Sequence, residues 1–129
     1  MANATSITLN DVAENTALAQ PTGDVLDTGT DAVTLPMTPA ADTHRILVEV
    51  TNTAAAADTM TVAVLGGDNP PASQGERGDL SFTVAQNAVK YLVLESARFM
   101  QSDGKINIKI TPASTKTQTA KIRAYRLPK

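Results

Sequence analysis

The chain has 129 residues and a net charge of −2, and it contains no cysteine, no tryptophan and a single histidine. The length fits one domain with its own core, and the lack of cysteine excludes a disulfide framework and a thiolate metal site. Neither a signal peptide nor an apolar run of the roughly 18 residues that span a membrane is present. We therefore expect a soluble protein with no membrane partner.

Charge is unevenly distributed along the chain. Residues 1–79 carry eleven acidic and two basic residues, a net charge of −9, whereas residues 80–129 carry two acidic and nine basic residues, a net charge of +7. Such asymmetry has three interpretations. The halves pair within one fold or form solvated faces, an acidic segment of one subunit meets a basic strand of its neighbour, or the basic half binds an anionic partner.

Residues 1–43 differ from the rest of the chain because they are rich in Thr, Asp, Ala and Pro. Turn signals at 21–24 and 28–29 separate short apolar stretches, and Pro36 and Pro39 interrupt any strand ladder. These stretches are short edge strands or part of an extended arm that lies along another surface. We predict an extended N-terminal arm with short edge strands over 1–43.

Residues 44–129 form the predicted β domain, because apolar and polar residues alternate in it. The alternation predicts strands over 44–52, 60–64, 80–84, 89–94, 105–111 and 120–125. The strand over 89–94 is apolar on both faces, so we expect it to be central in its sheet. Phe82 and Tyr91 occupy positions in the alternation that we expect to face the core.

The regular spacing of these strands, with turn signals at Gln86-Asn87 and Asp103-Gly104, is typical of sandwiches and barrels. The predicted fold is all-β, a single β-sandwich or small barrel of short antiparallel strands that follows the N-terminal arm. Its large side chains are mostly Val, Leu and Ile, which predicts a thin aliphatic core.

Candidate catalytic and metal-binding residues are few. His44 has no second histidine or cysteine near it, so it is a weak zinc ligand. Gly66–Asn69 lacks the spaced acidic ligands of a calcium loop. The tripeptide Arg77-Gly78-Asp79, which integrins read, and the glycosylation sequon Asn3-Ala4-Thr5 are both short enough to arise by chance. We predict no catalytic residue, no cofactor and no metal.

Four basic residues near the C-terminus alternate with apolar ones. Lys105 and Lys109 share one face of their strand, and Lys121 and Arg123 share one face of the last strand. If the two strands pair, the four cations form a patch. A solvated or edge-protecting face explains such a patch most simply. A protein interface and a nucleic-acid site are the alternatives, and the latter lacks stacking aromatics other than Tyr125.

The layout of the chain resembles that of head decoration (cement) proteins of tailed bacteriophages, or of related small phage structural proteins. The residues that carry the resemblance are the Thr/Ala/Gly-rich stretch 1–35, the compact β domain over 44–127, the segments 91–99 and 103–105, and the basic end 123–129. No catalytic residue belongs to the resemblance.

The resemblance implies a virion protein that is made in the bacterial cytoplasm and binds the outside of the expanded capsid, where it clamps neighbouring major-capsid subunits. Its partners would be the major capsid protein and further copies of itself, often as a trimer, and not nucleic acid. The interface residues expected on this basis are Ile7, Leu9, Val25, Leu26, Val33, Leu35, Lys105, Lys109, Lys121 and Arg123. A free-standing β-sandwich binding or adhesion module is the alternative, as is another phage part such as a head-fibre base, tail component or coat subunit.

Overall fold

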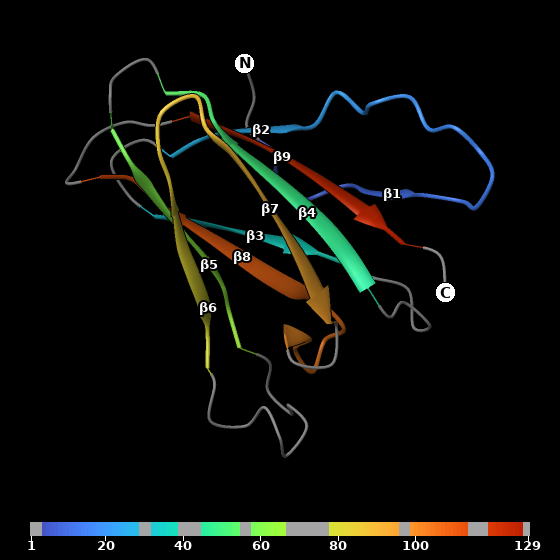
Figure 1. Ribbon diagram of the computed structural model, residues 1–129. Coiled ribbons are helices and arrows are strands. Elements are labelled where there is room, and N and C mark those ends of the chain that lie inside the picture. Colours follow the sequence, from blue (N-terminus) through green and yellow to red (C-terminus); the bar gives the residue numbers. More distant parts are fainter. Residues whose placement is uncertain are drawn as a thin grey trace.

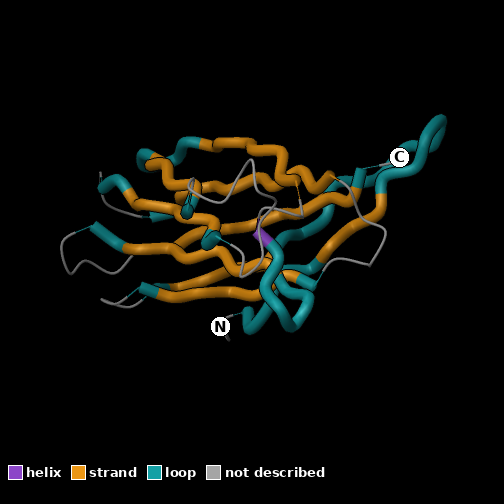
Figure 2. The backbone as a smooth tube through the Cα atoms, turned by 90° about the horizontal axis from the view of Figure 1, so that it is seen from below, coloured by secondary structure: helices purple, strands orange, loops and turns teal. Residues whose placement is uncertain are grey.

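The computed structural model describes residues 4–28, 32–38, 45–54, 58–66, 78–95, 99–113 and 119–127. The described residues form nine strands in two sheets that pack face to face, as Figures 1 and 2 show from two directions. The strands are β1 (Leu9–Asp11), β2 (Asp24–Asp27), β3 (Val33–Met37), β4 (Arg45–Asn52), β5 (Met60–Val64), β6 (Leu80–Val84), β7 (Val89–Glu95), β8 (Ile106–Thr111) and β9 (Thr119–Arg126).

One sheet has the strand order β1-β9-β4-β7, with β2 also paired to β9, and we call it the β9 sheet. The other has the order β3-β8-β5-β6, and we call it the β8 sheet. All pairs are antiparallel except β1 with β9. The order β2-β9-β4-β7 opposite β3-β8-β5-β6 is that of a double-sheet jelly roll. The predicted all-β sandwich is confirmed.

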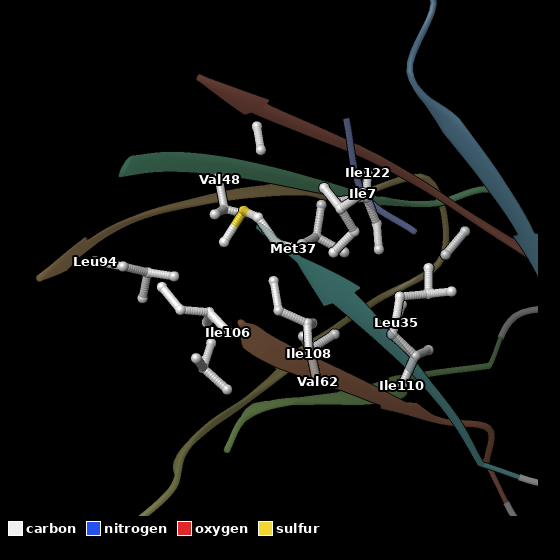
Figure 3. Close-up of a cluster of buried hydrophobic side chains, with 14 of the residues drawn as sticks. Ile7, Leu35, Met37, Val48, Val62, Leu94, Ile106, Ile108, Ile110 and Ile122 are labelled. Atoms are coloured by element: carbon white, nitrogen blue, oxygen red, sulfur yellow. The ribbon is translucent and has the colours of Figure 1, made fainter. Parts of the chain in front are cut away.

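The core lies between the two sheets and is almost entirely aliphatic (Figure 3). Every second residue of β4, β5, β8 and β9 points into it, as the alternation predicts. The side chains of these four strands that are fully buried are Ile46, Val48, Val50, Asn52, Met60, Val62, Val64, Ile106, Ile108, Ile110, Ala120, Ile122 and Ala124. Burying each large apolar side chain contributes about 1.5–3 kcal/mol, which makes this interior the main source of stability.

The first described residues run from one sheet to the other along one side of the sandwich. The backbone N–H of Ile7 donates to the carbonyl of Pro36 in β3 (2.9 Å), and Ile7 forms a bridge with Met37. Two residues later, Leu9 pairs with Ala124 of β9. This N-terminal segment therefore connects the edge strand of the β8 sheet to β9 and seals that side of the core.

For the described part of residues 1–43, the predicted short edge strands are present as β1, β2 and β3, whereas the predicted extended arm is wrong. Three of its apolar side chains, Ile7, Leu26 and Leu35, are at most 4% exposed and belong to the same core as the domain predicted over 44–129. Strands β1, β2 and β3 pair with β9 and β8 from the far end of the chain. The reason is that β8 and β9 would otherwise leave a row of unpaired backbone groups, which the N-terminal strands satisfy.

Strand β7 also differs from the expectation, because it lies at an edge. Among the described strands it pairs with β4 alone (Figure 1). Leu92 and Leu94 face the core, whereas Val89, Tyr91 and Val93 face outward and are 44%, 62% and 57% exposed. The predicted central position of this strand and the predicted burial of Tyr91 are therefore wrong. Phe82, by contrast, packs against the core as expected.

The two predicted turns are confirmed. Asn87 has a φ of 60° and Gly104 a φ of 81°, and both stand where the chain reverses direction. The turn at Gln86-Asn87 joins β6 of the β8 sheet to β7 of the β9 sheet, so it forms a corner of the sandwich rather than a hairpin. The two sheet edges that no other described strand covers, β6 and β7, therefore lie on the same side of the sandwich, opposite the sealed side.

Candidate interaction surface

The two outer faces of the sandwich differ in chemistry. On the outer face of the β8 sheet, side chains are small or polar, and Thr111, Thr61 and Thr83 lie directly opposite one another across three strands. Its remaining outward positions on the four strands are Thr34, Pro36, Ala63, Ser81, Asn107 and Lys109. This face has no large exposed apolar side chain among the residues described, and it fits a surface that stays in water.

The outer face of the β9 sheet is apolar along its β7 edge. Val89, Tyr91 and Val93, which we call the β7 triad, are three of the four large apolar residues that are exposed in the described chain. Across the sheet, Val93 lies opposite Leu47, and Leu47 lies opposite Tyr125. Exposed apolar side chains that gather on one face are typical of contact sites for proteins, membranes or ligands.

The backbone groups of the β7 triad also point away from β4. The carbonyl of Ala88 accepts a hydrogen bond from the N–H of Asn52 in β4 (3.2 Å), so it points toward β4. The N–H of Val89 lies on the opposite side of the same planar peptide and therefore points away from β4. Because backbone groups alternate in direction along a strand, Lys90, Leu92 and Leu94 direct theirs toward β4. The three triad residues direct theirs to the other side, where no described strand lies.

A buried ion pair occupies the centre of the same face. Glu49 of β4 lies opposite Tyr91 on one side and Arg123 on the other. The Arg123 guanidinium donates to Glu49 Oε1 (2.6 Å), and its Nε donates to the carbonyl of Pro21 (2.8 Å). Glu49 is only 5% exposed although it points away from the core. Removing either charge would leave the other without its oppositely charged partner in a largely buried position.

The charge of Glu49 also acts on Tyr125. Burial raises the pKa of the Tyr125 phenol above its ordinary value of 10.0. The negative charge of Glu49 raises this pKa further, and the positive charge of Arg123 opposes the shift. The phenol therefore stays neutral in any physiological solution and is suited to donate or accept a hydrogen bond at the surface.

A small recess lies where β2 and β1 follow one another along β9. Its volume is about 270 Å³, and Arg123 lies in its wall between the two strands. Thr8 donates through its N–H and its hydroxyl to Asp24 (2.6 and 3.2 Å), and Asn10 donates to the carbonyl of Ala124. These side chains already have protein partners, and the described residues contain no group of three potential metal ligands.

The six apolar residues predicted at an interface have different surroundings. Ile7, Leu26 and Leu35 are buried in the core, so the prediction that they contact another protein is wrong for the folded chain. Leu9 and Val33 pack against the same core and are half-buried. Val25 is the exception, because it lies opposite Lys121 on the outer face of the β9 sheet.

The four basic residues do not form one patch. Strands β8 and β9 belong to different sheets, so Lys109 and Lys121 point away from opposite sides of the sandwich. Lys105 is exposed in the turn before β8, and Arg123 is engaged by Glu49. The condition for the predicted patch, that the last two strands pair, is therefore not met.

The uneven distribution of charge is at least partly resolved within the fold. Glu49 pairs with Arg123, and Asp11 pairs with Arg126 at 2.8 Å. Each pair joins an acid of residues 1–79 to a base of β9. This agrees with the first interpretation of the asymmetry, in which the two halves of the chain meet inside one domain.

Several candidates from the sequence lie outside the described residues. These are His44, Arg77 of the integrin tripeptide, Asn3 of the sequon, and Asp68 and Asn69 of the candidate calcium loop.

The β7 triad is the feature that the sequence reasoning missed. Its signal was Lys90, which alternates with Leu92 and Leu94 on the core-facing side of the strand. A lysine on that side is tolerated at the edge of a sheet, where its ammonium reaches solvent, and not in the middle. An edge strand that is nevertheless apolar on its outer face indicates an interaction surface.

No family model matches the chain, and no curated protein is significantly similar to it. Within the described segments, no helix has both the length and the hydropathy that a membrane crossing requires.

Proposed function

We propose that this chain is a structural virion protein that binds the outside of a phage capsid through the outer face of its β9 sheet. The observation that carries the proposal is the contrast between the two outer faces. The outer face of the β8 sheet carries small or polar side chains, whereas that of the β9 sheet presents Tyr91 and Val93, each more than half exposed. This arrangement suits a module attached to a large shell, with one face for protein and one for water.

The choice of a phage shell as the partner rests on two supports. The layout of the sequence resembles that of head decoration proteins, and the strand order is that of the jelly roll, a fold used by viral capsid proteins as well as by lectins. The second support is an analogy at the level of the fold, which many unrelated functions share.

In this proposal the protein acts by binding one state of the shell. A module that binds where neighbouring major-capsid subunits meet in the expanded shell stabilises that state by mass action. The N-terminal segment contributes indirectly, because Ile7 and Leu9 help to build the module rather than reach out from it. The contact itself is assigned to the β7 triad and its neighbours Leu47 and Tyr125.

Co-sedimentation with purified phage shells tests this function. We expect saturable binding to expanded shells and none to unexpanded shells. Truncating the exposed ring in Tyr91→Ala should weaken binding at least about tenfold, because buried tyrosines are frequent hot spots of interfaces. Thr83→Ala is the matched control, since Thr83 is an exposed residue on the edge strand of the opposite sheet.

Two results would overturn the proposal: a folded protein that ignores expanded shells, or equal loss of binding in Tyr91→Ala and Thr83→Ala. Binding to phage tails instead of shells would reassign the protein to another part of the virion.

The exposure of Tyr91 favours one second candidate. An exposed aromatic ring on a jelly roll is suited to stack against a sugar, and lectins use this fold. Under this alternative the protein is a free-standing binding module. A glycan array with the wild-type chain and Tyr91→Ala separates the two, because only a sugar-binding module would lose a glycan signal in the variant.

A further inference from the structure

The outward-facing side chains of β7 form a palindrome along an edge that no described strand covers. The triad reads Val89, Tyr91, Val93, so it is the same in both directions about Tyr91. These three residues also direct their backbone N–H and C=O groups to the unpaired side. We propose that a second copy of this chain pairs antiparallel along β7, with a two-fold axis that passes beside Tyr91.

The two-fold axis pairs each exposed group with its counterpart. Tyr91 lies opposite Tyr91 of the second copy, and Val89 lies opposite Val93 of that copy. All three positions become hydrogen-bonded pairs, because their backbone groups point to the shared edge. A two-fold interface must be complementary to itself, and a palindromic strand meets that requirement. Aromatic and β-branched cross-strand pairs are among the favourable ones.

Lys90 is the residue that could oppose this pairing, because lysines protect edges against unwanted partners. In the register centred on Tyr91, Lys90 lies opposite Leu92 of the second copy. The two lysines are therefore diagonal to each other. They avoid the directly opposite arrangement, which is the destabilising one for like charges. Lys90 is exposed, so its stem can lie along Leu92 while its ammonium remains in water.

The rest of the molecule favours β7 over the other edges. The opposite side of the sandwich is closed by the N-terminal segment, which bonds to β3 and β9. Strand β6 is also an edge strand, but its outward residues are Ser81 and Thr83. Only β7 combines an unpaired edge with exposed apolar side chains in the described part of the chain.

The proposed dimer joins two β9 sheets into one continuous sheet and doubles the apolar outer face. It goes beyond the proposed function, because it requires no shell. It also differs from the trimer that the resemblance implies, since an antiparallel pair of identical edges closes at two copies.

The first test is the mass of the full chain in solution, measured by light scattering over a dilution series without shells present. A dimer that dissociates on dilution is expected. A monomer at every concentration, or a trimer, would overturn the proposal whatever the shells do.

Cross-linking tests the position of the axis. The chain has no cysteine, so Tyr91→Cys introduces a single thiol. Across a hydrogen-bonded antiparallel pair the two Cα atoms are about 5.5 Å apart, within the roughly 4.4–6.8 Å that a disulfide spans. We expect Tyr91→Cys to form covalent dimers under mild oxidation and the matched Thr83→Cys not to. Equal cross-linking of both would contradict the assignment to β7.

Charge pairs test the antiparallel register. Val89→Lys with Val93→Lys places like charges opposite each other twice, and should weaken the dimer at least about tenfold. Val89→Glu with Val93→Lys places opposite charges there and should retain the dimer. The positions are exposed, and circular dichroism verifies that both variants fold. Dimers of equal strength in the two variants would overturn the register.

Discussion

Asn52 is the residue on which most of the corner between the sheets depends. It is fully buried at the end of β4, and its side-chain amide donates to the carbonyls of Asp58 and Val84, each at 2.9 Å. Its Oδ1 accepts from the N–H of Ala54 (3.0 Å). One side chain thereby satisfies backbone groups before β5, at the end of β6 and after β4, and no apolar residue can replace it.

We predict that Asn52→Ala lowers the free energy of unfolding by about 3 kcal/mol, because it removes three hydrogen bonds to backbone groups, two of which belong to the buried residues Ala54 and Val84. Urea unfolding followed by circular dichroism measures the change. Gln86→Ala is the control, since Gln86 is half-buried and donates a single bond to Ala54, so its loss should cost about 1 kcal/mol. Equal effects of the two substitutions would contradict the role given to Asn52.

Tyr125 reports on the ion pair beside it. Its pKa is raised first by burial and then by Glu49. We predict that Glu49→Gln lowers this pKa toward 10.0 without reaching it, because burial remains. Absorption of the phenolate during alkaline titration measures the pKa, and the Tyr91→Phe background removes the only other tyrosine. An unchanged pKa in Glu49→Gln would show that Glu49 does not act on the phenol.

The raised pKa of Tyr125 also makes the stability of the folded state depend on pH in alkaline solution. The folded state holds the phenolic proton more tightly than the unfolded chain, whose pKa is 10.0. Unfolding then releases a proton in alkaline solution, so this group's contribution to stability is complete below pH 10. The contribution falls as the pH rises from 10 through the folded pKa.

At the scale of elements, the N-terminal segment is a structural part of the sandwich. Ile7 is 4% exposed, whereas Leu18, in the connection between β1 and β2, is 45% exposed. We predict that Ile7→Ala lowers the free energy of unfolding by about 2–5 kcal/mol, and Leu18→Ala by less than about 0.5 kcal/mol. Thermal or urea unfolding measures both. If both substitutions lowered the free energy of unfolding only slightly and equally, the N-terminal segment would be an extended arm rather than part of the core.

Strand β7 shows that the position of a strand in its sheet decides whether its outer face is covered or exposed. Its alternation predicts a strand with Leu92 and Leu94 on one face and the triad on the other, and the structure has that strand. Alternation describes only the two faces of a strand, however, and contains nothing about its neighbours. Because β9 pairs with β4 on the side away from β7, β7 remains at the edge and its second apolar face stays exposed.

At the scale of the whole molecule, strands from the acidic and the basic half of the chain belong to one sandwich. Leu9 pairs with Ala124, and Asp11 forms an ion pair with Arg126. The acidic and basic halves meet at β9, whose other edge pairs with β4. The result is a single sandwich with a polar face over the β8 sheet and a partly apolar face over the β9 sheet, and the proposed binding and self-association both use the second.

The sequence by itself determined the class of the fold, the strands over 46–50, 60–64 and 106–110 with their buried faces, and the aliphatic character of the core. Period-two alternation is a local property, so these conclusions need no knowledge of neighbours. Only the tertiary structure decided that Ile7 and Leu35 are core residues, that Lys109 and Lys121 lie on opposite sides, and that the β7 triad is exposed. Each of these depends on which strands pair across the chain, and pairing between distant segments is set by the packing of the whole sandwich rather than by any one strand.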